Sequence, residues 1–202
     1  MPLTNRIQYP PAARDFCLRV KFRDGGYLVK QLRSRFALDT KSVLDFGCGT
    51  GRIASVLGSR SYVGIDVDVV RVGFAAAQCP RNSFLVYDGD TIPFRNESFD
   101  VVFVSSVLHH LSDAAVRYYS EEFSRVLIPD GQVIVLEPAY NHSSPLRNLY
   151  MRTFDQGSYI RETSAYMRLL HDQFQMTHEL SYNAANFYTN TLLSGVKRSP
   201  AQ

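Results

Sequence analysis

The feature that most constrains the fold of this chain is a glycine-rich turn between a mostly apolar run and a helical pattern. Val43–Phe46 is followed by Gly47, Gly49 and Gly51 at alternate positions, and Arg52–Leu57 continues with helical spacing. Glycine adopts positive φ at little cost and places no Cβ against a neighbouring group. The first N–H groups of a helix are unpaired and carry partial positive charge. We therefore predict a strand, a tight turn and a helix that hold a small ligand against the backbone.

The spacing of these glycines narrows the kind of ligand. It is G-x-G-x-G, whereas dinucleotide sites use G-x-G-x-x-G and P-loops use G-x-x-x-x-G-K-[ST]. Asp45 stands just before the turn, and its carboxylate would repel a polyphosphate. A ligand that carries both a cation and an anion fits better. A strand–glycine–helix junction alone also occurs where an α/β unit needs close packing, so the prediction depends on the spacing and on Asp45.

Val43–Gly51 resembles the first motif of the class I S-adenosylmethionine-dependent methyltransferases, in particular their small-molecule, methyltransferase-11-like type. The resemblance implies that the cofactor is S-adenosyl-L-methionine. It also implies that Asp45, Gly47, Cys48 and Gly49 lie against the methionine part of this cofactor, with Asp45 on the side of the ammonium group.

A second strand is predicted at Ser61–Asp66, followed by a helix at Val69–Gln78 with Asp68 as its N-cap. The carboxyl ends of neighbouring parallel strands meet at one edge of a sheet, so Asp66 should lie beside the glycine turn. The resemblance implies that Asp66 accepts hydrogen bonds from both ribose hydroxyls of the cofactor.

Two further strands lead to the same edge. Phe84–Tyr87 predicts the third, and the Asp- and Gly-rich stretch after it contains Asp90 and Thr91. These two residues resemble the adenine-binding element of the family, although the same composition also predicts a simple turn. Val101–Leu108 is apolar and β-branched, as in a central strand buried on both faces. Ser105, near its end, completes the implied cofactor contacts.

Candidate acid–base residues also lie at this edge. His109 and His110 follow the fourth strand, Glu137 ends a fifth strand at Gln132–Glu137, and His142 comes shortly after. A general base is needed only if the methyl acceptor is a hydroxyl or a protonated amine. We expect one of the adjacent histidines to face the substrate and the other to be packed or solvated, and Glu137 could instead shape the pocket floor. Adjacent histidines without Asp or Cys at ligand spacing do not predict a metal site.

The remaining pattern completes an α/β fold. Ser112–Leu127 has the apolar stripe of a buried helix, and Thr163–Phe174 predicts another helix, followed by a strand of period two. A turn at Asn183–Ala185 leads to a last strand at Asn186–Val196. We predict a doubly wound, mostly parallel, Rossmann-like sheet of seven strands that ends in an antiparallel β-hairpin, as the resemblance requires.

With 202 residues, the chain is long enough for one domain with a buried core. We divide it into an N-terminal helical cap at 1–38, a cofactor-binding core at 39–137, a lid and helix at 138–174, and the terminal hairpin at 175–197. Within the cap, Ala13–Phe36 is expected to be helical.

The lid begins with Pro138–Glu162, which shows no clear periodicity and is expected to be irregular. His142, Arg147, Arg152 and Arg161 alternate there with aromatic residues. These side chains could hold an anionic, partly apolar or glycan-like acceptor, and they could equally be ordinary surface residues.

Composition argues against several other classes of protein. The net charge is only +3, with no basic stripe, which does not indicate a nucleic-acid partner. The three cysteines include no C-x-x-C pair, so neither a disulfide framework nor a zinc site is predicted. No stretch approaches the length of an apolar membrane span, and the first residues lack the apolar block of a signal peptide. We expect a cytoplasmic protein.

The sequence therefore predicts an S-adenosylmethionine-dependent methyltransferase that acts by in-line methyl transfer to a small-molecule or glycan- or lipid-like acceptor. One alternative is a non-catalytic subunit that binds the same cofactor. Another is a nicotinamide-dependent oxidoreductase on a Rossmann sheet, against which the glycine spacing and the terminal hairpin argue. The acceptor, the methylated atom and the oligomeric state stay open.

Overall fold

The computed structural model describes residues 25–57, 61–184 and 187–199. Most of the predicted cap lies outside the described residues, and its described end is helix α2 (Gly25–Arg35), followed by a short 3-10 helix, η1 (Leu38–Thr40). The other helices are α3 (Ala54–Leu57), α4 (Val69–Gln78), η2 (Leu108–His110), α5 (Asp113–Val126), α6 (Pro145–Phe154) and α7 (Thr163–Leu170). The strands are β1 (Ser42–Phe46), β2 (Ser61–Asp66), β3 (Ser83–Val86), β4 (Phe99–Ser105), β5 (Leu127–Tyr140), β6 (Arg161–Glu162), β7 (Phe174–Asn183) and β8 (Thr189–Lys197).

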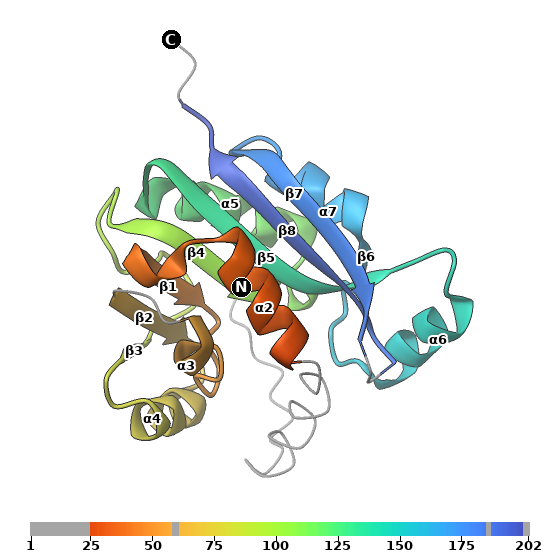
Figure 1. Cartoon of the computed structure of the whole chain (residues 1–202), viewed down its shortest axis with the longest axis horizontal. Coiled ribbons are helices and arrows are strands. Elements are labelled where there is room, and N and C mark those ends of the chain that lie inside the picture. Colours follow the sequence, from red (N-terminus) through yellow and green to blue (C-terminus); the bar gives the residue numbers. More distant parts are fainter. Residues whose placement is uncertain (1–24, 58–60, 185–186, 200–202) are drawn as a thin grey trace.

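The strands form one sheet in the order β3-β2-β1-β4-β5-β8-β7, with β6 beside the end of β5 (Figure 1). Strands β1 to β5 pair in parallel, whereas β8 runs antiparallel to both β5 and β7. The predicted α/β fold, with seven mostly parallel strands and a terminal antiparallel hairpin, is confirmed. The two-residue β6 is an addition, too short to leave a sequence pattern.

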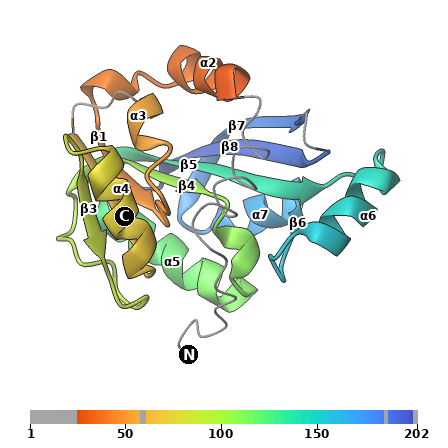
Figure 2. The same ribbon diagram turned by 90° about the horizontal axis from the view of Figure 1, so that it is seen from below.

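Two hydrophobic layers cover the sheet. Side chains of a strand alternate between its faces. Leu44 of β1 and Val102 of β4 join the layer that contains α5 and α7, whereas Val43 and Phe103 join the layer that contains α2 and α3. Figure 2 shows these two pairs of helices on opposite sides of the sheet. Because both faces are covered, the central strands consist of nearly continuous apolar residues, and their polar residues gather at the strand ends.

The fifth strand is longer than predicted. It begins at Leu127, directly after α5, and its pairing with β4 shifts between Phe99 and Val101. Pro129 and Gly131, which stand between the predicted helix at Ser112–Leu127 and the predicted strand at Gln132–Glu137, lie in this shifted part of β5. The other predicted elements differ only at their ends: α3 begins at Ala54, α7 ends at Leu170, β3 spans Ser83–Val86 and β8 begins at Thr189.

The expectation that Pro138–Glu162 is irregular was wrong. The segment contains the helix α6 and the strand β6. Pro145 occupies the first turn of α6, where its missing N–H costs nothing. Apolar residues recur at helical spacing only within the ten residues of α6, where Arg147 and Arg152 stand among them, so the segment as a whole shows no clear periodicity.

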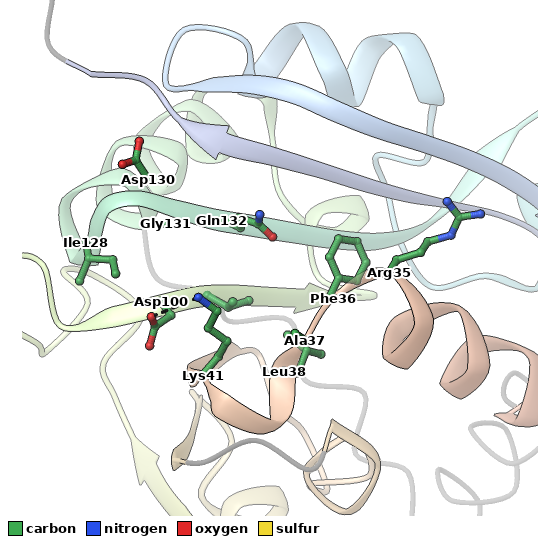
Figure 3. Close-up of a pocket in the computed structure, with 11 residues that line it drawn as sticks. Arg35, Phe36, Ala37, Leu38, Lys41, Asp100, Ile128, Asp130, Gly131 and Gln132 are labelled. Atoms are coloured by element: carbon green, nitrogen blue, oxygen red, sulfur yellow. Dashed lines mark ion pairs between the residues drawn. The ribbon is translucent and has the colours of Figure 1, made fainter.

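A hollow of about 210 Å³ lies at the amino-terminal edge of the sheet (Figure 3). Phe36 and Gln132 line it, and at one end Lys41 Nζ lies 3.7 Å from Asp100 Oδ1. The other oxygen of Asp100 accepts hydrogen bonds from the backbone N–H and the hydroxyl of Ser42, at 2.8 and 2.6 Å. These polar groups tie the start of β1 to the start of β4, which gives this end of the hollow a structural role.

Candidate cofactor site and active site

The glycine turn after β1 has the backbone conformation that its sequence predicts. Gly47, Gly49 and Gly51 have φ angles of +73°, +52° and +73°. The N–H groups of Gly47 and Cys48 both donate to the carbonyl oxygen of Ile65 in β2, at 2.8 and 3.0 Å. The turn is therefore held against the end of β2.

Two glycines of this turn have different roles. A Cβ at Gly47 would lie 2.4 Å from Cγ2 of Val107, so close packing alone demands glycine there. A Cβ at Gly49 would have no neighbour nearer than the Arg71 guanidinium, at 4.0 Å. Glycine at position 49 is needed for its positive φ, and the backbone there presents a surface that a ligand can approach closely.

The Cys48 side chain lies on the other side of the turn. Its Cβ and Sγ would both be 2.8 Å from a Cβ at Gly64, so it packs directly against β2. Burial raises the pKa of the Cys48 thiol. Cys48 therefore offers a ligand its backbone and not a thiolate.

Asp66 ends β2 and fixes the glycine turn. Its Oδ2 accepts a hydrogen bond from the N–H of Gly49 at 2.8 Å, and its Oδ1 accepts one from the N–H of Asp68 at 2.9 Å. Asp68 is the N-cap of α4, as predicted, and accepts from the N–H groups of Val70 and Arg71. Two fixed backbone donors hold the Asp66 carboxylate in one orientation at the carboxyl edge.

Asp45 is buried in β1 and accepts a hydrogen bond from the hydroxyl of Tyr62 in β2. Burial raises the pKa of Asp45 to about 7; the hydrogen bond from Tyr62 opposes this rise, and the charge of Asp66 adds to it. The Asp45 carboxyl group is therefore poised between its neutral and ionised forms at neutral pH. A cation placed beside it would favour the ionised form.

Asp90 and Thr91 lie in an exposed turn after β3. Oδ1 of Asp88 accepts a hydrogen bond from the N–H of Asp90 at 3.0 Å, and the Thr91 hydroxyl lies 3.3 Å from that of Tyr118. The Asp- and Gly-rich composition thus builds a turn, which is the simpler of the two predictions for this stretch.

Asp88 lies closer than Asp90 to the end of β3 in the chain. Burial and Tyr119 raise the pKa of Tyr87, and the charges of Asp66 and Asp88 raise it further. The charges of both carboxylates therefore act on the Tyr87 hydroxyl. Asp88 is therefore a second candidate, beside Asp90, for a contact at this strand end.

The end of β4 has two unusual residues. The hydroxyl oxygen of Ser105 is buried and has no hydrogen-bond partner among the described residues. Ser106 follows with φ of +56°, a conformation that costs a non-glycine residue about 1 kcal/mol or more. Buried unpaired polar atoms and backbone strain both concentrate at ligand sites.

Glu137 of β5 organises the segment after β4. Its buried carboxylate accepts hydrogen bonds from the N–H groups of Val107, Leu108 and His109, at 2.8, 2.9 and 3.3 Å. The same carboxylate lies 2.6 Å from Nδ1 of His109. Nε2 of that ring is 3.4 Å from Oδ1 of Asp155, although it is not in hydrogen-bond geometry. The fully buried His109 therefore sits between two carboxylates.

The loop after α6 covers His109. A Cβ at Gly157 would lie 2.0 Å from Cδ2 of the His109 ring, so the backbone of this loop touches the ring. The N–H of Tyr159 donates to the His109 carbonyl at 2.9 Å, and Asp155 accepts a hydrogen bond from the N–H of Gly157 at 2.7 Å. The loop and the imidazole form one packed unit.

Arg161 fixes the other end of η2. It donates to the carbonyl oxygens of Leu108 and Leu111, at 2.9 and 2.6 Å, and to Oδ1 of Asp113 through two nitrogens, at 2.9 and 2.6 Å. Arg161 is almost fully buried. The short helix η2 is therefore clamped from β5 by Glu137 and from the lid by Arg161.

Comparison with known proteins identifies the family. Residues 44–135, which include the glycine turn, Asp66 and the end of β4, match a family model described as a methyltransferase domain. The chain therefore carries the domain of the class I S-adenosylmethionine-dependent methyltransferases.

Relatives of this methyltransferase include proteins of different size. A probable S-adenosylmethionine-dependent methyltransferase of Mycolicibacterium smegmatis is 31% identical over 156 residues, which are 76% of this chain and 58% of that protein. A probable tRNA methyltransferase 9B of Homo sapiens is 35% identical over 95 residues, which are 46% of this chain and 20% of that protein. The chain thus spans a fifth to three fifths of the length of these relatives.

Solved structures agree on the fold. A chain from the complex between the Haloferax volcanii Trm112 methyltransferase activator and a putative methyltransferase superposes with a TM-score of 0.72. The match covers 90% of this chain and 94% of that chain, at 18% identity. The methyltransferase fold is therefore present over nearly the whole chain.

S-adenosylmethionine is the cofactor that this family implies, and the described residues fit it. The approachable backbone at Gly49, the oriented carboxylate of Asp66 and the buried carboxyl group of Asp45 suit a carboxylate, ribose hydroxyls and an ammonium group respectively. Within the described ranges, no group of three His, Cys, Asp or Glu side chains could hold a metal ion. None of the helices described is long and apolar enough to cross a membrane.

The four predicted acid–base candidates of the methyltransferase are not equivalent. The Glu137 carboxylate is occupied by three backbone N–H groups and the His109 ring, and the alternative expectation, that it shapes the pocket floor, stays a prediction. His109 is fully buried, and its two ring nitrogens lie beside Glu137 and Asp155. Because this ring is enclosed and positions η2, the expectation that it acts as a base does not fit this structure. His110 is exposed, with its ring 4.1 Å from that of His109. His142 is 88% exposed and lies 2.9 Å from Glu162.

The basic residues of the lid make contacts within the protein. Arg161 is committed to η2, and Arg147 donates to two backbone carbonyl oxygens, at 3.2 and 3.3 Å. The Arg152 guanidinium lies 5.1 Å from the centre of the Tyr140 ring. Arg161 is therefore a positioning residue, contrary to the prediction that it could hold an anionic acceptor.

Three organising contacts were not predicted from the sequence. Tyr62 binds Asp45, Asp155 faces His109, and Arg161 binds η2. The residues in these pairs are far apart in the chain, and no local motif marks them. The strand register gives a partial signal for Tyr62 only. Tyr62 lies opposite Val43 in the β1–β2 pairing, and Val43 and Asp45, two residues apart in β1, point to the same face of the sheet.

Proposed function

We propose that this chain transfers the methyl group of S-adenosylmethionine to a small-molecule or lipid-like acceptor. The observation that carries the proposal is the link between Asp66 and Gly49. The carboxylate proposed to bind the ribose and the backbone proposed to face the methionine part are joined by one hydrogen bond of 2.8 Å. Both halves of the cofactor site are thereby fixed relative to each other.

The protein residues then act mainly by positioning. Bound S-adenosylmethionine supplies a methyl group that its sulfonium already activates. The carboxylates of Asp45 and Asp66 would orient the cofactor, and the clamped helix η2 would hold the acceptor side rigid. Holding two reactants in line lowers the barrier by several kcal/mol, about 7–11 in the best cases.

His110 and His142 are the remaining candidates for a general base. Their rings are exposed, whereas His109 and Glu137 are engaged inside the protein. We also propose that residues 138–174, with α6, β6 and α7, cover the acceptor side, and that 1–38 and 39–137 act as cap and core.

A second candidate is methylation of tRNA. The probable tRNA methyltransferase 9B of Homo sapiens favours it, and the Haloferax volcanii complex adds the possibility of an activator protein. The low net charge of +3 argues against a large nucleic-acid interface. Family membership, for its part, makes the nicotinamide-dependent oxidoreductase the least favoured alternative.

The test is to offer methyl-labelled S-adenosylmethionine and the purified chain to three separate pools: small metabolites, extracted lipids and unmodified tRNA. We expect label in the first or second pool, and none with an Asp66→Ala variant. Label in tRNA alone would replace the proposal with the second candidate. Tight cofactor binding without label in any pool would indicate a non-catalytic subunit and contradict the proposal.

A further inference from the structure

Helix α6 exposes most of its apolar side chains. Leu146, Leu149 and Phe154 are 71%, 62% and 66% exposed, whereas Met151 is the residue of α6 that is buried. A helix that only covers a core would turn such residues inward. The exposed face of α6 therefore adds nothing to the core of the described part of the chain.

These side chains form one stripe. At 3.6 residues per turn, positions 146, 149, 150 and 154 fall within an arc of about 140°. Arg147 and Arg152 lie on the two sides of this arc, and α6 contains no acidic residue. The helix thus combines an apolar face with flanking cations, the pattern of helices that lie in a membrane interface.

Phe187 extends the stripe beyond α6. Its ring lies 5.6 Å from that of Tyr150, and the Arg147 guanidinium lies 4.8 Å from its centre. Phe187 is 44% exposed and has φ of +69°, a strained conformation for an aromatic residue. The fold holds an exposed phenyl ring beside α6 at an energetic cost, which suggests a use for the ring.

We propose that this surface, made of α6 and Phe187, docks the protein on an anionic lipid membrane. The leucines and phenylalanines would enter the acyl boundary, and the exposed Arg152 would reach lipid phosphates, whereas Arg147 stays bound to backbone carbonyl oxygens. A second copy of the chain is a poorer occupant, because a two-fold pairing of α6 would bring arginines together with no acidic residue of the helix to balance them.

The position of the surface connects it to the proposed function. Asp155, directly after α6, faces His109 at the end of the active-site floor. Figure 1 and Figure 2 show α6 at one end of the molecule and α4 at the other. A protein docked through α6 would meet lipid-like acceptors beside its acceptor side, and this last step rests on the proposed function.

The test is flotation of the purified chain with two kinds of vesicle, phosphatidylcholine alone and phosphatidylcholine with phosphatidylglycerol. We expect binding to the anionic vesicles that falls with added salt. A triple variant, Leu146→Ser with Leu149→Ser and Phe154→Ser, should bind at least about tenfold more weakly, since burial of apolar side chains carries such contacts. Arg152→Gln should weaken binding to the anionic vesicles only.

The matched control removes similarly exposed apolar side chains from α4. Val70 and Phe74 are 61% and 42% exposed, and Val70→Ser with Phe74→Ser should leave vesicle binding unchanged. Equal binding of the triple variant and the unaltered chain would overturn the proposal. So would a concentration-dependent dimer, without vesicle binding, that the triple variant abolishes, because it would assign the surface to a second copy.

Calorimetry with S-adenosylhomocysteine separates this proposal from the proposed function. Cofactor binding without vesicle binding would refute the docking surface alone. Vesicle binding without cofactor binding would refute the proposed function and leave the docking surface supported.

Discussion

At the scale of single residues, Asp45 links protonation to folding. Its pKa is raised to about 7 in the folded chain, mainly by burial, from an ordinary value of 3.8. Between these two values the folded state binds a proton that the unfolded state has lost. The free energy of unfolding should therefore fall as pH rises from about 4 to about 7, and this contribution should be constant above pH 7.

The measurement is urea unfolding of the chain and of Asp45→Asn across this pH range. The variant lacks the titrating group, so the stability of the unaltered chain relative to the variant should fall with rising pH. Each unit of raised pKa contributes about 1.4 kcal/mol. Parallel curves for the two proteins would show that Asp45 is ionised throughout.

Cofactor affinity should change with pH in the opposite direction. If the ammonium group of the cofactor lies beside Asp45, it favours the ionised carboxylate. Binding of S-adenosylhomocysteine should strengthen as pH rises through about 7. In the unaltered chain the hydrogen bond from Tyr62 lowers the pKa of Asp45, so its removal in Tyr62→Phe should raise that pKa and move the change to higher pH. Calorimetric titration at several pH values measures both effects. An affinity independent of pH in the unaltered chain would separate Asp45 from the cofactor.

The adjacent histidines should differ sharply in their effect on stability. His109→Ala removes the partner that lies between the buried carboxylates of Glu137 and Asp155, and should cost about 3 kcal/mol or more. His110→Ala shortens a side chain at the surface, whose ring contacts that of His109, and should cost clearly less than His109→Ala. Urea midpoints of the two variants test the difference, and equal losses would contradict the packing described for His109.

At the scale of elements, the loop after α6 and the helix η2 behave as one unit. Gly157→Ala would place a methyl group 2.0 Å from the His109 ring and 2.8 Å from its carbonyl oxygen. The loop and η2 would have to separate, which should destabilise the fold by about 1–3 kcal/mol. It should also reduce methyl transfer more than cofactor binding, because η2 lies on the proposed acceptor side.

Gly73→Ala is the matched control for this prediction. Gly73 lies within α4, and a Cβ there would meet nothing within 4 Å. Alanine in a helix interior is favoured over glycine by about 0.5–1 kcal/mol, so this variant should be more stable than the unaltered chain. Equal stability of Gly157→Ala and Gly73→Ala would contradict the close packing of this loop on His109.

At the scale of the whole molecule, local patterns predicted the sheet and the glycine turn at its carboxyl edge. Apolar runs that end in glycine or aspartate marked β1 and β2, and alternation marked the terminal hairpin. Such signals lie within a few residues of one another, so the sequence carries them directly. Element boundaries were predicted less accurately where one element follows another without a break, as β5 follows α5 at Leu127.

The acceptor side could not be predicted in the same way. The contacts of Glu137 with η2 and of Arg161 with Leu108 join residues about 30 and 53 positions apart. Nothing near either residue indicates its partner. Helix α6 was not predicted for a different reason, because Arg147 and Arg152 stand among its few apolar residues along the chain.

The central claim is that the carboxyl edge of β1, β2 and β4 binds S-adenosylmethionine. Calorimetric titration of the purified chain with S-adenosylhomocysteine and, separately, with NAD tests it most directly. We expect micromolar binding of S-adenosylhomocysteine, about −8 kcal/mol, no heat with NAD, and at least about tenfold weaker binding in Asp66→Ala, which loses charge-assisted hydrogen bonds. Binding of NAD instead, or S-adenosylhomocysteine affinity unaffected by Asp66→Ala in a folded variant, would contradict the account.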